Sequence, residues 1–183
     1  MARMSPKENI RRGHRNQENG AAFEKMLGQL FAHMATAGLA RIAKVPEPLR
    51  VLGPSEKGIW RAIYIRGAAM VDYQGTLMGG RAVYLEAKYT KAEKMEQDRV
   101  AERQAEALDL YAALGASCGV LCTFRLGCTG LVPWAAWRRM KELFGRKYLK
   151  PEDLAAMGWE ISLFDARALC QALHSLSLYR MEK

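Results

Sequence analysis

Two strand-like runs joined by a glycine-rich loop are the feature that most limits how this chain can fold. The runs span residues 69–74 and 81–88, and the loop between them contains Gly75, Gly79 and Gly80. Such a pattern predicts an antiparallel β-hairpin. Because alternate side chains of a strand share a face, Glu86 and Lys88 are expected to project together from the second strand.

The same hairpin is expected to bring Asp72 from the first strand close to Glu86. Mg²⁺ prefers oxygen ligands and commonly takes only one or two protein carboxylates. Asp72 and Glu86 fit that need, with the Ala87 carbonyl as a third oxygen and Mn²⁺ as a substitute ion. Next to such a metal ion, Lys88 could orient a water that attacks a phosphodiester and could offset the negative charge that builds up on its phosphorus. The alternative is an ordinary surface hairpin in which the same carboxylates and lysine form salt bridges without a metal ion.

The composition indicates one domain with an acidic partner. The chain has 183 residues, half of them apolar, and a formal net charge of +9, which favours nucleic acid as the partner. No apolar run approaches the roughly 20 residues that span a bilayer, and no signal-peptide core follows the basic N-terminus. We therefore expect a cytoplasmic protein without membrane contact. Buried, reduced cysteines are favoured over a zinc site made by Cys118, Cys122 and Cys128.

The pattern along the chain predicts a flexible basic arm, residues 1–19, and a single folded domain, residues 20–183. Apolar periodicity predicts helices at 22–38, 93–114, 134–144, 151–157 and from 165 onward. Strand-like runs outside the hairpin lie at 40–45, 49–52, 59–65, 118–124, 129–132 and 160–163.

Asp72, followed 14 positions later by Glu86-Ala87-Lys88, resembles the D…(D/E)xK signature of the restriction-endonuclease-like PD-(D/E)XK superfamily. The stretch VDYQGTLMGGRAVYLEAKYT further resembles RecU-type Holliday junction resolvases, in which a threonine follows the catalytic lysine. GAAFEKMLGQLF, ARIAKVPEPLRV, GVLCTF and YLKPEDLAAMGWEI extend the resemblance over roughly residues 20–165. Val71 stands where the superfamily often has proline. The resemblance implies an α/β fold with a central mixed sheet flanked by helices.

Two further residues are candidates for the active site. Glu24 lies at the edge of the first helix's apolar stripe, beside Leu27 and Phe31, where it could reach the metal. A solvated glutamate on the helix flank is the alternative. Gln104 falls inside the apolar stripe of the second helix, where an amide needs partners, so it either lines the site or is a satisfied core glutamine.

Residues 57–66 (KGIWRAIYIR) combine aromatic and basic side chains, which suits a projection at about 53–68 that contacts a DNA junction. A strand with a solvated basic face is the alternative. The candidate phosphate contacts are Arg11, Arg12, Arg15, Lys44, Lys57, Arg61, Arg66, Lys91 and Lys94.

The RecU resemblance implies a Mg²⁺-dependent endonuclease that resolves four-way junctions by paired symmetric nicks, leaving 5′-phosphates. Two opposed nicks require two active sites, so a twofold-symmetric homodimer is expected. The alternatives are another nuclease of the superfamily, of phage repair or restriction type, and a non-catalytic junction-binding module.

Overall fold

The computed structural model describes residues 6–65, 70–125 and 127–179, and the side chains of residue 20 onward within those ranges. The helices are α1 (Pro6–Thr36), α2 (Glu102–Ala113), α3 (Trp134–Arg138), α4 (Met140–Phe144), α5 (Pro151–Ala156) and α6 (Ala166–Ser175), with short 3₁₀ turns η1 (Gln97–Arg99) and η2 (Leu176–Leu178). The strands are β1 (Ala40–Lys44), β2 (Leu49–Pro54), β3 (Trp60–Tyr64), β4 (Tyr73–Leu77), β5 (Ala82–Thr90), β6 (Met95–Glu96), β7 (Ser117–Phe124), β8 (Thr129–Pro133) and β9 (Tyr148–Leu149).

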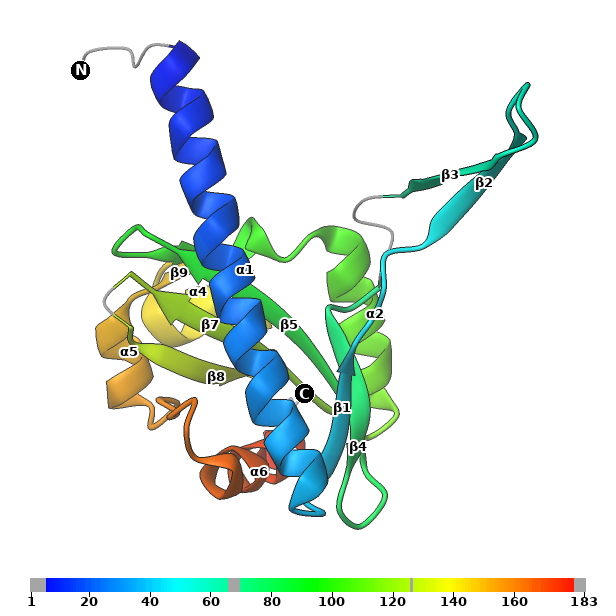
Figure 1. Ribbon diagram of the computed structural model, residues 1–183. Coiled ribbons are helices and arrows are strands. Elements are labelled where there is room, and N and C mark those ends of the chain that lie inside the picture. The colour runs from blue at the N-terminus through cyan, green and yellow to red at the C-terminus, as the bar shows by residue number, and fades with distance from the viewer. Residues whose placement is uncertain (1–5, 66–69, 126, 180–183) are drawn as a thin grey trace.

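A five-stranded sheet of order β1-β4-β5-β7-β8 forms the centre of the molecule (Figure 1). β5 and β7 are parallel and are joined through α2, whereas the other neighbouring pairs are antiparallel. On one face α1 and α6 pack against Val83 and Leu85, and on the other α2 and α3 pack around Val120. The expectation of a mixed central sheet flanked by helices is confirmed.

The β4–β5 hairpin forms as predicted, but the bounds predicted for its first strand are wrong. β4 begins at Tyr73 rather than residue 69 and continues through Gly75, which the sequence suggested to be in the loop. This strand position requires glycine, because β1 passes so close that a Cβ there would overlap the Arg41 carbonyl and lie 2.7 Å from Ile42 Cα. Asp72 therefore precedes the strand instead of lying within it.

The N-terminal segment differs from the predicted arm, since α1 begins at Pro6 and continues without interruption into the packed helix. Once the turns around Leu27 are fixed against the sheet, each added residue gains a backbone hydrogen bond without a new nucleation cost. The backbone of the first half of α1 extends beyond the sheet (Figure 1).

Three other predicted elements have different bounds or form in the structure. The second helix starts at Glu102 rather than residue 93, because Met95 and Glu96 pair with β9. The helix predicted at 134–144 divides into α3 and α4 at Arg139. Residues 160–163 contribute a single bridge, between Glu160 and Gly130, instead of a strand.

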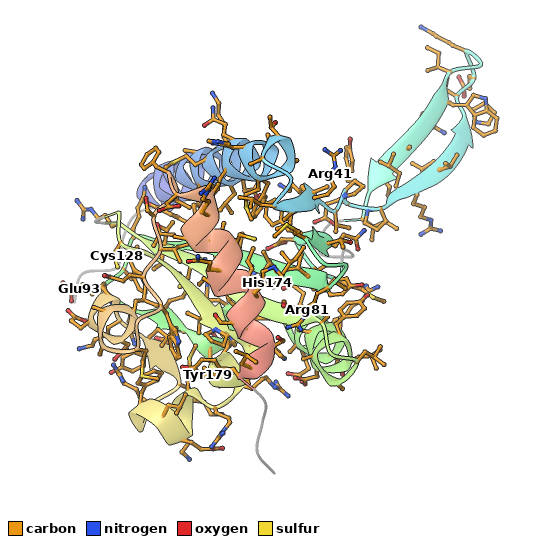
Figure 2. The ribbon with its side chains drawn as sticks, turned by 90° about the horizontal axis from the view of Figure 1, so that it is seen from below. Arg41, Arg81, Glu93, Cys128, His174 and Tyr179 are labelled. Atoms are coloured by element: carbon orange, nitrogen blue, oxygen red, sulfur yellow. The ribbon has the colours of Figure 1, made fainter. Side chains whose placement is uncertain are left out.

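β2 and β3 form a separate two-stranded ribbon that extends away from the rest of the molecule (Figure 1 and Figure 2). The ribbon begins at Leu49, earlier than the predicted projection at 53–68, and all five residues of β3 are exposed. Among the described residues, the strands of the ribbon pair only with each other, so the central sheet does not stabilise them through strand pairing.

The cysteine thiols are free, and Cys118, Cys122 and Cys170 are buried as predicted, whereas Cys128 is partly exposed. Among the described helices, none combines the length and apolarity needed to cross a bilayer.

Candidate active site

The site lies where β4 starts and β5 continues past it. Tyr73, the first residue of β4, pairs with Leu85, so the stretch of β5 beyond Leu85 faces Asp72 instead of another strand residue. Asp72 Oδ2 accepts the Ala87 backbone N–H at 2.9 Å, and the Asp72 backbone N–H donates to Glu86 Oε1 at 3.1 Å. This reciprocal pair of hydrogen bonds sets the two carboxylates side by side.

Lys88 joins both carboxylates. Its Nζ lies 2.6 Å from Glu86 Oε2 and 3.5 Å from Asp72 Oδ2. Since Glu86 and Lys88 are two residues apart on one strand, they share a face, as the sequence predicts. The Lys88 side chain is 14% exposed, so its ammonium is held inside the site and not in bulk water.

Burial dominates the electrostatics of Glu86. Its side chain is fully buried, and this desolvation raises the pKa of its carboxyl to about 8; Lys88 opposes the shift and Asp72 adds to it. The single ammonium of Lys88 therefore does not fully compensate two adjacent carboxylates. A divalent cation would supply the missing positive charge.

The donor set fits a hard divalent ion. Residues of an extended strand direct N–H and C=O to the same side, so the Ala87 carbonyl faces the side on which Asp72 receives the Ala87 N–H. Asp72, Glu86 and this carbonyl give three oxygen ligands. Within the described residues no three His, Cys, Asp or Glu side chains gather as a metal cluster, and Mg²⁺ does not require one, because water and phosphate complete its shell.

Glu24 makes no ion pair or hydrogen bond with Asp72, Glu86 or Lys88 in the described part of the chain. It forms an ion pair with Lys44, the residue of β1 that is paired directly with Tyr73. Lys44 is therefore engaged with a carboxylate, and its contact with phosphate stays a prediction. Through Lys44, the Glu24 side chain of α1 is held at β1, the neighbour of the strand that follows Asp72.

Gln104 lies in the first turn of α2, half-buried, where its Oε1 accepts the Ala101 N–H at 3.3 Å. Two helical turns further along α2, Tyr111 stacks on Tyr84 with ring centroids 3.7 Å apart. Because α2 runs back between two parallel strands, Gln104, about 10 Å before Tyr111, lies toward the Lys88 end of β5. One acceptor of the amide is satisfied by the helix start, and the side chain has no hydrogen bond to the carboxylates.

The predicted phosphate contacts are scattered. Lys57 and Arg61 are exposed on the β2–β3 ribbon, Lys91 follows β5, and Lys94 pairs with Glu96 at 2.6 Å. Arg11, Arg12 and Arg15 lie on the first half of α1, whose side chains are outside the described residues, as is Arg66.

Sequence reasoning missed Arg50 and Tyr73. Arg50 is paired with Ile63 and therefore shares a ribbon face with Arg61; strand alternation could have indicated this once the pairing was known. Tyr73 is 2% exposed, and its hydroxyl is one of the buried polar atoms without a hydrogen bond in the described part of the chain. Its position next to Asp72 was the only signal in the sequence.

Comparison with known proteins identifies the family of this chain. The family model of RecU, recombination protein U, matches residues 18–170. Among solved structures, Archaeoglobus fulgidus Hjc, a Holliday junction resolvase from an archaeal hyperthermophile, is similar at 17% identity and a TM-score of 0.39, over 63% of this chain and 73% of that one. No curated protein matches the sequence significantly. Because the family match covers most of the chain, the protein belongs to the RecU family of divalent-metal-dependent endonucleases that resolve Holliday junctions.

Proposed function

We propose that this protein is a Mg²⁺-dependent endonuclease that resolves four-way DNA junctions in the cytoplasm by paired symmetric nicks, with Mn²⁺ as a substitute ion. The observation that carries the proposal is the convergence of Asp72, Glu86 and Lys88 at the free edge of β5. The Asp72 carboxylate accepts the Ala87 N–H, the Glu86 carboxylate accepts the Asp72 N–H, and both lie close to the Lys88 ammonium. A hairpin does not need such a group of charges for its own stability.

Asp72, Glu86 and the Ala87 carbonyl would hold the cation. When bound, Mg²⁺ offsets the negative charge that develops on the phosphate and polarises its oxygens. Lys88, fixed by Glu86 and Asp72, would orient the attacking water. The water oxygen would form a bond to phosphorus and lose a proton to solvent, while the P–O3′ bond breaks and O3′ takes up a proton from solvent. The products are a 5′-phosphate and a 3′-hydroxyl.

The β2–β3 ribbon supports a role at the junction. One of its faces carries Arg50 and Arg61, while the other carries Trp60 and Tyr64, which are 71% and 69% exposed. We assign the arginine face to phosphates near the junction centre. An isolated ribbon is marginally stable in water, so its apolar face requires cover. A second protomer related by a twofold axis would provide cover and would supply the second active site.

The test compares cleavage of a synthetic four-way junction with cleavage of a linear duplex of the same sequence. We expect Mg²⁺-dependent nicks in opposed strands of the junction and little cutting of the duplex. Equal rates on both substrates would point to another nuclease of the superfamily. A wild-type protein that binds the junction but stays inert with Mg²⁺ and Mn²⁺ would be a non-catalytic binding module.

Asp72→Asn is the matching variant, because asparagine keeps an acceptor for the Ala87 N–H but lacks the charge. Its junction cleavage should fall by about 100-fold or more while binding persists. Glu142→Gln serves as the control, since Glu142 is an exposed partner of Arg139 on α4.

A further inference from the structure

Tyr73 has a buried hydroxyl that the fold leaves without a partner. The residue is 2% exposed, and its ring packs edge-on against Phe31 of α1 with centroids 5.2 Å apart. Its hydroxyl makes no hydrogen bond within the described part of the chain. A buried hydroxyl ordinarily has a partner, because leaving it unpaired is unfavourable.

The surroundings of Tyr73 contain two carboxylates. Lys44 is the direct cross-strand partner of Tyr73, so the two side chains lie on one face of the sheet, toward α1. Lys44 in turn holds Glu24 through its ion pair. Glu24 and Phe31 are seven residues apart on α1 and therefore occupy the same helix face. The Tyr73 ring therefore lies on the α1 side of the sheet, beside the Lys44–Glu24 ion pair and next to Asp72 in the chain. Burial raises the pKa of its hydroxyl, and the charges of Glu24 and Asp72 add to that shift.

We propose that Tyr73 is a positioning residue, whose hydroxyl donates to the Glu24 carboxylate and so holds Glu24 beside Asp72 when a divalent cation is bound. Tyr73 and Lys44 then fix Glu24 from two sides, one by hydrogen bond and one by charge. The inference rests on the proposed function, because Glu24 matters only if Asp72 and Glu86 bind a cation. The hydrogen bond from Tyr73 would place the Glu24 carboxylate near the cation, which its ion pair with Lys44 alone does not do.

Tyr73→Phe removes the hydroxyl and keeps the ring against Phe31. The first measurement is Mn²⁺ binding to the DNA-free protein by calorimetry, and the second is the Mg²⁺ concentration that gives half-maximal junction cleavage. We expect weaker Mn²⁺ binding by about 3- to 10-fold, a matching rise in the Mg²⁺ requirement, and recovery of cleavage at high Mg²⁺. Tyr84→Phe is the matched control, because its ring stacks on Tyr111 on the opposite face of the sheet.

A double-mutant cycle with Glu24→Gln separates positioning from a general structural effect. If Tyr73 acts through Glu24, then Glu24→Gln combined with Tyr73→Phe should bind Mn²⁺ no more weakly than Glu24→Gln alone. The melting temperature of Tyr73→Phe without metal should stay at or above that of the wild type, since only an unpaired hydroxyl is lost. Unchanged Mn²⁺ binding in Tyr73→Phe, or additive losses in the cycle, would overturn the inference.

Asp72→Asn distinguishes this failure from failure of the proposed function. If Asp72→Asn abolishes Mn²⁺ binding while Tyr73→Phe behaves as the wild type, only the role of Tyr73 is lost. If the wild type binds no Mn²⁺, or Asp72→Asn binds it normally, both proposals are wrong.

Discussion

The backbone N–H of Asp72 donates to the carboxylate of Glu86 at 3.1 Å, although the two residues are 14 positions apart. Asp72 therefore contributes twice to the site, through its side chain on Ala87 and through its main chain on Glu86. This arrangement keeps a fully buried carboxylate oriented without surrounding it by cations.

Replacing Glu86 by glutamine should remove cleavage while preserving the fold. The amide oxygen can still accept from Asp72, and no charge remains to be desolvated. We expect junction cleavage to fall at least about 100-fold, with a metal-free melting temperature within a few degrees of the wild type. Activity assays and thermal melts check this together. If Glu86→Gln cleaves junctions at the wild-type rate, Glu86 is not a ligand of the catalytic metal ion.

Lys88→Met should separate metal binding from chemistry. Both carboxylates remain and the repelling ammonium is gone, so Mn²⁺ affinity should be retained or increased. Cleavage should still fall by about 100-fold or more, because the group that orients the water is lost. Calorimetry and single-turnover cleavage provide the two measurements, with exposed Lys141→Met as control. Loss of both Mn²⁺ binding and cleavage would contradict the assigned role.

Arg50→Ala and Arg61→Ala should weaken junction binding without changing stability, because both side chains are exposed on the ribbon. Each lost phosphate contact should reduce the slope of log K against log salt by about 1. Binding titrations over a salt series in EDTA measure this slope. Lys141→Ala should leave it unchanged. A slope unaltered by both ribbon variants would exclude the arginine face from DNA contact.

Gly75→Ala should destabilise the fold by roughly 1–3 kcal/mol, because its methyl group would overlap the Arg41 carbonyl. Gly28→Ala is the opposite case, a helical site on α1 with no neighbouring atom within 4 Å, and should stabilise by about 0.5–1 kcal/mol. Urea unfolding of both variants tests the pair. Equal stability of Gly75→Ala and the wild type would show that β1 can move away from β4.

Native thiol labelling should discriminate among the cysteines. Burial raises the pKa of Cys118 and of Cys122 to about 12, so both stay protonated and covered near neutral pH. Cys128 is partly exposed, although burial and Glu160 raise its pKa to about 11. N-ethylmaleimide followed by mass spectrometry should show Cys128 modified first and the others only after unfolding. Equally fast labelling of Cys122 would contradict the packing of β7.

The hairpin and the shared direction of Glu86 and Lys88 could be predicted from the amino-acid sequence, because strand alternation is local and requires no knowledge of other elements. The hairpin pattern also suggested that Asp72 lies near Glu86. The mixed sheet flanked by helices was expected from the resemblance to RecU-type resolvases.

The start of β4, the ion pair between Lys44 and Glu24, and the burial of Tyr73 with an unpaired hydroxyl could be learned only from the three-dimensional structure. Each of these depends on β1 pairing with β4 and on α1 packing above them. Such contacts join residues 20 or more positions apart. Their register is set by packing of the whole sheet, including the close approach at Gly75, so the pattern of neighbouring residues does not contain it.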